Sequence, residues 1–324
     1  MKPTIAVCSL FRDSAPEVPY FRALLDHQVA AADRPFDLLF SFVEGDSRDD
    51  TWERLGGWAA SDPRVILQKR DVEPLASWDA RIQAWAALGN ATIEQLQGRD
   101  WDYLLWCESD LCLPPDLMQL LLRSGQDIVA PAVFLGGLFY DTWGFRALDG
   151  SHFTNEPPHH PQFHPLGLTE LASVGSTVLF RRAVFDAGIR FRPEYPNGLL
   201  AGVCSDARAR GFQVWCDSRA AVIHPTMRWE HQQYRMGGVE IDCTAVRAGG
   251  DALRERVLAL VAEVPAPLLG AAELDPDHAV LADFRRRLET CLPAPAFEIV
   301  TTLGSQAGRE YTLLIRDRQS ARAA

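Results

Sequence analysis

The chain has 324 residues, of which 47% are hydrophobic and 23% charged, and its formal net charge is −11. This composition is typical of one large or two small globular domains and argues against wholesale disorder. The negative charge argues against broad nucleic-acid binding, which needs a basic face. An anionic small molecule would need a local positively charged group to bind it, such as a metal ion or a few arginines.

The cysteines and the N-terminus indicate a compartment. None of the seven cysteines shows C-x-x-C spacing and several lie in apolar runs, so we expect reduced core cysteines. The opening MKPTIAVCSLF is too short and too strand-like for a signal peptide. No apolar run approaches the roughly 20 residues of a membrane span. We therefore expect a soluble, cytoplasmic protein without a membrane span.

The first hundred residues alternate between strand-like and helix-like segments. Apolar runs predict strands at residues 4–10, 36–43, 64–68 and 103–107, and helical periodicity predicts helices at 19–32, 51–60 and 78–96. Such alternation is typical of a mostly parallel sheet covered by helices on both faces. Ligands bind these sheets at the carboxyl edge. The polar segments 8–14, 44–51 and 108–110 follow predicted strands, so we expect them to converge on one crevice.

The rest of the chain contains further predicted strands at 127–133, 174–182, 213–216 and 220–224, and a helix at 206–210. Residues 151–165 are rich in proline and histidine, which predicts a surface loop. We expect it to form part of the acceptor site and to become ordered when substrate binds, with a solvated surface loop as the alternative. From about residue 251, two amphipathic helices precede two strand-like runs, FEIVTTL and YTLLIRD. We therefore divide the chain into a catalytic domain at 1–244 and a small α+β appendage at 245–324.

Two acids, Glu108 and Asp110, follow the apolar run at 103–107. Burying an ionised carboxylate is costly unless it is paired or bound to a metal, and residues two apart on an extended backbone face the same way. Carboxylate oxygens are the ligands that Mg²⁺ and Mn²⁺ prefer. These two acids therefore predict a metal site, with a solvated acidic turn as the alternative.

Two other polar positions end apolar strands. In VEGDSRDDT, at 43–51, Glu44 and the small polar residues after it are able to accept hydrogen bonds from a base or a ribose. The same stretch also suits a helix start with Asp50 or Thr51 as N-cap. His224 closes the run AAVIH, where a core histidine and a metal ligand are the two interpretations.

Four segments together resemble the nucleotide-sugar glycosyltransferases of the GT-A fold, over about residues 3–230. VEGDSRDDT resembles their V-D-D-G-S-x-D-x-T turn, and LLWCESDLCLPPDLMQLLL resembles their D-x-D motif with the helix after it. VGSTVLFRRAVFDAGIRF and GFQVWCDSRAAVIHP are similar to the segments that follow. FYDTWGFRALDG also resembles fungal capsule-associated mannosyltransferases, and SLFRDSAPEVPYF and DSRDDT resemble fungal mannan-type mannosyltransferases.

The resemblance implies an α/β, GT-A-like (Rossmann-like) fold and a set of site residues. It implies that Mn²⁺ or Mg²⁺ is held by Glu108, Asp110 and His224. It places the donor, a nucleotide-diphosphate sugar, against Phe11, Arg12, Glu44, Ser109, Gly175 and Ser176, and the acceptor against Asp141 and Trp143. Arg81 on the long helix is a further candidate for donor binding, with an exposed helical arginine as the alternative. Trp143 offers a flat apolar face for a sugar ring, with a core tryptophan as the alternative.

The catalytic base is where the chain departs from the family pattern. Many inverting members carry a Glu-Asp pair where this chain has Leu199 and Leu200. Asp206 or Glu170 is then the candidate base, unless no general base is used, which would fit a retaining enzyme.

We expect a metal-dependent glycosyltransferase that moves a hexosyl group from a UDP- or GDP-sugar to an unidentified acceptor. A glycan, a small metabolite, a lipid and a carrier protein all remain open as acceptors. A catalytically silent sugar-nucleotide-binding or scaffold protein is the alternative. A sugar nucleotidyltransferase is disfavoured because SLFRDSAPEV has no glycine-rich phosphate loop after the first strand.

Overall fold

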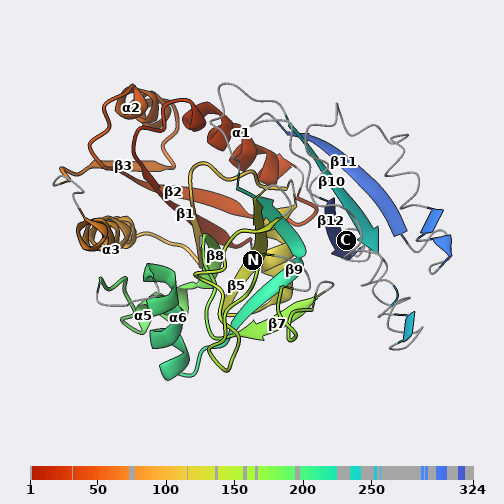
Figure 1. Ribbon diagram of the computed structural model, residues 1–324. Helices are drawn as coiled ribbons and strands as arrows, with labels where there is room; N and C mark the ends of the chain where they lie inside the picture. The colour runs from red at the N-terminus through yellow and green to blue at the C-terminus, as the bar shows by residue number, and fades with distance from the viewer. Residues whose placement is uncertain are drawn as a thin grey trace.

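The computed structural model (Figure 1) describes residues 2–30, 32–72, 77–114, 116–135, 138–155, 159–164, 167–193 and 198–224. It also describes the backbone of 234–241, 297–304 and 313–317, and the isolated residues 252–253, 256, 286–287 and 289–290.

The central element is a nine-stranded sheet in the order β3-β2-β1-β4-β8-β5-β9-β7, with β6 paired to β5. Its strands are β1 (Thr4–Phe11), β2 (Asp37–Glu44), β3 (Val65–Lys69), β4 (Tyr103–Cys107), β5 (Ile128–Leu135), β6 (Leu138–Phe139), β7 (Leu168–Leu171), β8 (Thr177–Arg181) and β9 (Val214–Ile223).

The directions of the strands place most of their carboxyl ends at one edge of the sheet. The pairs β1–β2, β1–β4, β2–β3 and β5–β9 are parallel, and β8 runs antiparallel between β4 and β5. The carboxyl ends of β1, β2, β3, β4, β5 and β9 therefore lie at one edge of the sheet, together with the start of β8. The predicted mostly parallel α/β sheet is confirmed.

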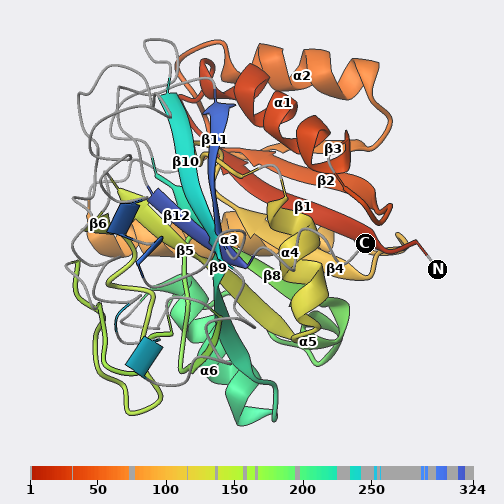
Figure 2. The ribbon, with the colours of Figure 1, turned by 90° about the vertical axis from the view of Figure 1, so that its right-hand side faces the viewer.

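Helices cover both faces of this sheet, as Figures 1 and 2 show. Side chains of α1 (Glu17–Ala30), α2 (Thr51–Ser61) and α4 (Leu117–Ser124) pack on one face. Side chains of α3 (Trp78–Glu94), α5 (Arg182–Asp186) and α6 (Leu199–Ala209) pack on the other. Alternate residues of β1 enter the two cores, Ile5 and Val7 one and Ala6 and Cys8 the other, because strand side chains alternate between faces.

Four elements differ from their prediction. The two strands predicted at 213–216 and 220–224 form one strand, β9, whose pairing with β5 shifts where Pro131 faces Asp217 and Ala132 faces Ala221. This bulge accommodates the polar residues that looked like a break in the sequence. The short strands β6 and β7 were not predicted, and α6 begins before the predicted residue 206.

A second sheet contains β10 (Tyr234–Ile241), β11 (Phe297–Gly304) and β12 (Leu313–Asp317) in the order β11-β10-β12. The two strand-like runs near the C-terminus are thereby confirmed, and β12 lies near β9. The helices predicted between 251 and 295 lie mostly outside the described residues. The division at 244/245 stays a prediction, and β10 from before it pairs with strands from after it.

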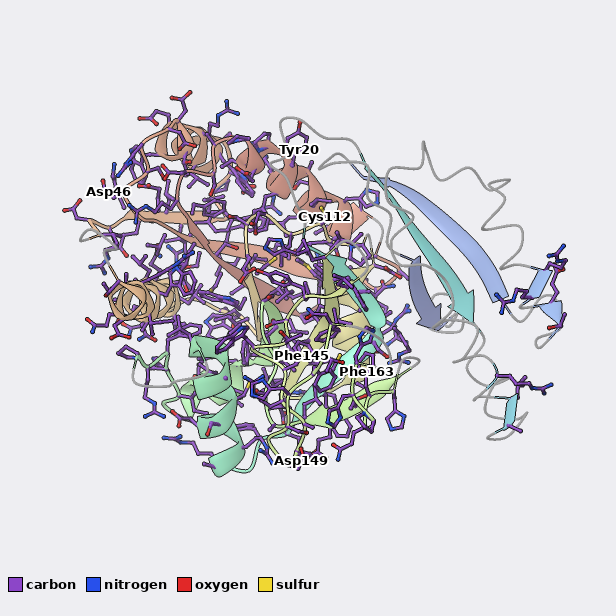
Figure 3. All side chains as sticks on the ribbon, in the orientation of Figure 1. Tyr20, Asp46, Cys112, Phe145, Asp149 and Phe163 are labelled. Carbon is purple, nitrogen blue, oxygen red and sulfur yellow. The ribbon has the colours of Figure 1, made fainter. Side chains whose placement is uncertain are left out.

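The proline- and histidine-rich segment is packed where the structure describes it. Phe153 and Phe163 are 2% and 8% exposed and contact Phe139, and His160 stacks on Phe153. Phe145, labelled with Phe163 in Figure 3, joins the same aromatic cluster. The expected surface loop is therefore anchored by buried rings in its described part, 151–155 and 159–164.

Two further expectations concern the cysteines and the membrane. The five cysteines that the structure describes, Cys8, Cys107, Cys112, Cys204 and Cys216, are free and buried, as predicted. None of the helices within the described residues combines the length and the apolar character needed to cross a bilayer.

Candidate metal centre and its surroundings

Three potential metal ligands meet at the carboxyl edge of the sheet. Glu108 and Asp110 follow β4, and His224 follows β9. The strands β4 and β9 are not neighbours in the sheet. They are joined beyond their ends by Cys112 and Ile223, whose backbones exchange two hydrogen bonds of 2.8 and 3.1 Å. This bridge brings His224 to the acidic turn although 112 residues separate Cys112 from His224 in the chain.

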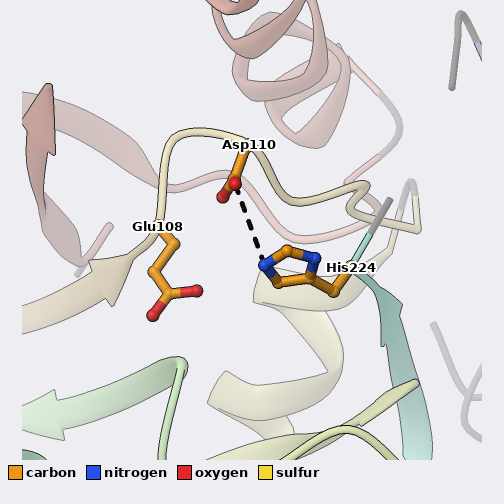
Figure 4. Close-up of side chains that lie close together, drawn as sticks. All are labelled: Glu108, Asp110 and His224. Carbon is orange, nitrogen blue, oxygen red and sulfur yellow. Dashed lines mark ion pairs between the residues drawn. The ribbon is translucent and has the colours of Figure 1, made fainter. Parts of the chain in front are cut away.

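The ligand atoms are close enough to share one ion. One oxygen of Glu108, one oxygen of Asp110 and one ring nitrogen of His224 all lie within 4.8 Å of one another. The distance from His224 Nε2 to Asp110 Oδ2 is 3.8 Å (Figure 4). Ligands about 2.1 Å from a Mg²⁺ ion lie up to about 4.2 Å apart, so small side-chain rotations complete the coordination. Two carboxylates and an imidazole suit Mn²⁺, which accepts both oxygen and nitrogen.

The charges of the cluster also favour a cation. Burial raises the pKa of Glu108 well above its usual range, and the charges of Asp110 and Asp141 raise it further. Within the described part of the chain, no hydrogen-bond donor reaches the carboxylate of Glu108 or Asp110. The Asp110 side chain is 45% exposed, which leaves the cluster open to solvent and ligand. A bound divalent cation would relieve the repulsion between these acids.

Tyr140 is a site residue that sequence reasoning missed. Its ring stacks on the imidazole of His224 with a centroid distance of 4.2 Å and an interplanar angle of 29°. The backbone amide of His224 donates to the carbonyl of Phe134 (2.7 Å), which holds the other end of the same residue. The position of Tyr140 beside Asp141 was the available signal, but its contact with a residue 84 positions away was not visible in the sequence.

Asp141 lies against the start of β8. Its Oδ1 accepts a hydrogen bond from the Gly144 amide (2.9 Å), and its Oδ2 accepts one from Ser176 Oγ (2.9 Å). A Cβ added at Gly175 would lie 2.2 Å from Asp141 Oδ2, so only glycine fits there. Ser176 has a φ of +57°, an uncommon value for a residue with a side chain. Both predicted residues of this strand start, Gly175 and Ser176, therefore contact the predicted acceptor residue Asp141.

Burial raises the pKa of Asp141, and the hydrogen bonds from Ser176 and Gly144 oppose that rise. Burial likewise raises the pKa of Tyr140 to about 12, with contributions from Glu108, Asp141 and Asp110. The positive charge of Arg81, an exposed residue of α3, lowers it in part. The Arg81 guanidinium lies 4.5 Å from the ring of Trp85 on the same helix.

The residues predicted to bind the nucleotide differ in accessibility. Arg12 is half-buried, and its Nη1 has no hydrogen-bond partner among the described residues. Phe11 is 2% exposed and packs on Phe21 and Phe42, so its ring belongs to the core. Glu44 is fully buried; its Oε1 accepts from the Ser47 amide (2.5 Å), and its Oε2 lies 3.9 Å from Lys69 Nζ. Ser109 is buried between the two acids.

The acidic turn after β2 is fastened to the loop after β1. Asp49 Oδ2 accepts from the Ala15 amide (3.0 Å), Thr51 Oγ1 from the Ser14 amide (2.7 Å) and Asp13 Oδ1 from the Arg48 amide (2.7 Å). Asp50 is the N-cap of α2, but its side chain makes no capping hydrogen bond. These contacts give Asp49, one of the three acids of DSRDDT, a structural role.

The structure does not bring the two candidate bases to the cluster. Asp206 Oδ1 accepts from Arg192 Nη2 (2.8 Å), an ion pair that engages its carboxylate. Glu170 pairs with Trp215, at the start of β9. Nine residues of extended strand separate Trp215 from His224, about 30 Å. Glu170 therefore lies toward the opposite edge of the sheet, because β7 runs antiparallel to β9.

Comparisons with known proteins show structural likeness only. No protein-family model matches the sequence, and no curated protein matches it. Among solved structures, a mannosyltransferase, PcManGT from Pyrobaculum calidifontis in complex with GDP-Man and Mn²⁺, shares 14% identity at a TM-score of 0.45, covering 89% of this chain and 70% of that chain. S. aureus TarS 1–349 shares 15% identity at a TM-score of 0.42, covering 90% and 72%. At these scores neither structure says what this chain does.

Proposed function

We propose that this chain is a metal-dependent glycosyltransferase that uses a nucleotide-diphosphate sugar as donor. The observation that carries the proposal is the convergence of Glu108, Asp110 and His224 at the carboxyl edge of the sheet. In open α/β sheets this edge is where ligands bind. The likeness to fungal mannosyltransferases stays a prediction from short motifs.

The chain's own residues have distinct roles in this proposal. Glu108, Asp110 and His224 hold the ion, and Tyr140 keeps the imidazole in place. The cation, when bound, neutralises negative charge that grows on the departing diphosphate. Arg12 follows β1 at the same edge, and its Nη1 is buried without a hydrogen-bond partner among the described residues. Its guanidinium is proposed to turn toward the phosphates when the donor binds. Such positive groups are needed because the chain itself carries a net charge of −11.

A catalytically silent sugar-nucleotide-binding protein is the second candidate. It is supported by two observations: the Asp206 carboxylate is engaged by Arg192, and Glu170 lies toward the opposite edge of the sheet. Asp141 is the remaining predicted site carboxylate near Glu108. Because both of its oxygens accept hydrogen bonds, we assign it to positioning the start of β8.

A turnover assay separates the two candidates. The parent protein and Glu108→Gln are incubated with a panel of UDP- and GDP-sugars, cell extract as acceptor source, and either Mn²⁺ or EDTA. We expect UDP or GDP release only from the parent with Mn²⁺, together with a product heavier by one hexose in mass spectrometry. If UDP or GDP binds but the protein releases neither nucleotide from any sugar donor, the catalytically silent candidate is supported. Equal release with EDTA would overturn the metal-dependent transferase.

A further inference from the structure

One aromatic side chain near the candidate metal centre is exposed. Trp143 is 71% exposed, whereas Trp58, Trp101 and Trp106 are 2%, 5% and 8% exposed. A tryptophan is usually well buried because its ring is large and apolar. Its exposure in a protein with an ample core indicates that the ring has a role at the surface.

The turn that carries Trp143 is rigid. The Phe145 amide donates to the Asp141 carbonyl (3.0 Å), and Arg146 Nη1 donates to the Thr142 carbonyl (2.7 Å). Arg146 and Asp141 are 5% and 9% exposed. The indole is therefore exposed on a buried and hydrogen-bonded support. A preorganised aromatic ring binds a partner at a low cost in conformational entropy.

The turn that carries Trp143 begins beside the candidate metal centre. Tyr140 stacks on His224 with a centroid distance of 4.2 Å, and three peptide units join Tyr140 to Trp143. Consecutive Cα atoms are 3.8 Å apart, so the two Cα atoms lie at most about 11 Å apart. This distance is comparable with the length of a disaccharide. An acceptor lying on Trp143 is thus able to extend a sugar hydroxyl toward the centre.

We propose that the indole of Trp143 is a stacking platform for the acceptor, and that the acceptor is a carbohydrate. The C–H face of a pyranose ring is apolar and covers the indole, while its hydroxyl groups stay in water around the rim. A lipid acceptor would need a broad contiguous apolar patch. The other large exposed apolar side chains on this described segment are Leu138 and Leu148, only 37% and 44% exposed. The identity of the acceptor rests on the proposed function, whereas saccharide binding to Trp143 does not.

The test uses the full chain and the variants Trp143→Leu, Trp143→Phe and Leu148→Ser. Mannobiose, cellobiose, lactose and chitobiose serve as probes, and binding is followed by intrinsic tryptophan fluorescence and calorimetry without donor. We expect one of the disaccharides to bind the parent, with at least tenfold weaker binding to Trp143→Leu. Trp143→Phe keeps part of the affinity, and Leu148→Ser, which removes exposed apolar surface from the same segment, keeps all of it.

Two outcomes overturn the inference. One is that no probe binds, or that a probe binds the parent and Trp143→Leu equally. The other is association with phosphatidylcholine–phosphatidylglycerol vesicles that Trp143→Leu and Leu148→Ser both abolish, because an apolar membrane contact then explains the exposed ring. Thermal melts with GDP or UDP and Mn²⁺ test the proposed function separately, since they involve no acceptor. Saccharide binding without nucleotide binding would therefore reject the transferase and keep the platform.

Discussion

Two acidic turns follow the strands that flank β1, and the acids of these turns differ in their hydrogen bonding. After β2, Glu44 and Asp49 each accept a hydrogen bond from a backbone amide. After β4, no described donor reaches the carboxylates of Glu108 and Asp110, and His224 approaches instead. The first turn is richer in acids, yet Asp49 links it to the loop after β1 and Glu44 holds the turn itself. The supply of backbone donors, and not the number of acids, distinguishes the structural turn after β2 from the candidate metal site after β4.

The largest expected effect tests the turn after β4. Asp110→Asn removes one ligand and should abolish the stabilisation by Mn²⁺ with UDP or GDP in thermal melts. At a ligand concentration one hundred times Kd, that stabilisation is about 2.7 kcal/mol in the parent. The fold should survive, because the change also relieves repulsion with Glu108. Equal stabilisation of parent and variant would show that the two turns do not differ in this way.

A change in the turn after β2 should lower the stability of the fold and leave the Mn²⁺ requirement unchanged. Asp49→Ala leaves the amides of Ala15 and Thr51 without their acceptor and should cost about 1–3 kcal/mol of unfolding free energy, measured by urea denaturation. Asp50→Ala is the matched control, since its side chain makes no capping bond, and should change stability by about 0.5 kcal/mol or less. Both variants should need the same Mn²⁺ concentration as the parent. A raised requirement in Asp49→Ala would make this turn part of the metal site.

Tyr140 offers a further test because its ring supports His224, the residue that approaches the turn after β4. Tyr140→Leu removes the ring that stacks on His224 and should raise the Mn²⁺ concentration at half-saturation roughly tenfold. Tyr140→Phe keeps the ring and should behave like the parent. The measurement is Mn²⁺ titration followed by electron paramagnetic resonance, which is independent of turnover. A large shift in Tyr140→Phe would instead assign the effect to the hydroxyl group.

The smallest expected effect concerns Asp62, whose carboxylate accepts hydrogen bonds from the Arg64 side chain. The hydrogen bonds from Arg64 lower the pKa of Asp62 to about 2, against about 3.9 in an unfolded chain. Because the folded pKa is depressed, this contribution is complete above about pH 4 and is lost as the pH falls toward 2. Since the Arg64 side chain is 44% exposed, we expect about 1 kcal/mol after solvent screening.

Urea denaturation of Asp62→Asn between pH 5 and pH 2.5 measures this contribution. The variant should lose stability at pH 5 and show a flatter pH dependence. Asp100→Asn serves as the control, since Asp100 is exposed and forms no ion pair with the described residues. An unchanged slope in Asp62→Asn would assign the acid sensitivity to other carboxylates.

The alternation of strands and helices, and the polar residues that end the strands, were predictable from local sequence patterns. These are local properties: periodicity reports which face a side chain occupies, and an acid after an apolar run must lie where the chain leaves the core. That is why Glu108, Asp110 and His224 were predictable as candidates. The same reasoning found the two C-terminal strand runs, which became β11 and β12.

The tertiary structure alone decided which of these polar ends meet. The Cys112–Ile223 bridge brings His224 to Asp110, while the pairing of Glu170 with Trp215 holds that acid toward the opposite edge. The stack of Tyr140 on His224 and the exposure of Trp143 also depend on packing between distant segments. Strand order and register arise from contacts across the whole chain. The alternation of apolar and polar residues along a strand shows which face is buried, but it does not say which strand lies beside it.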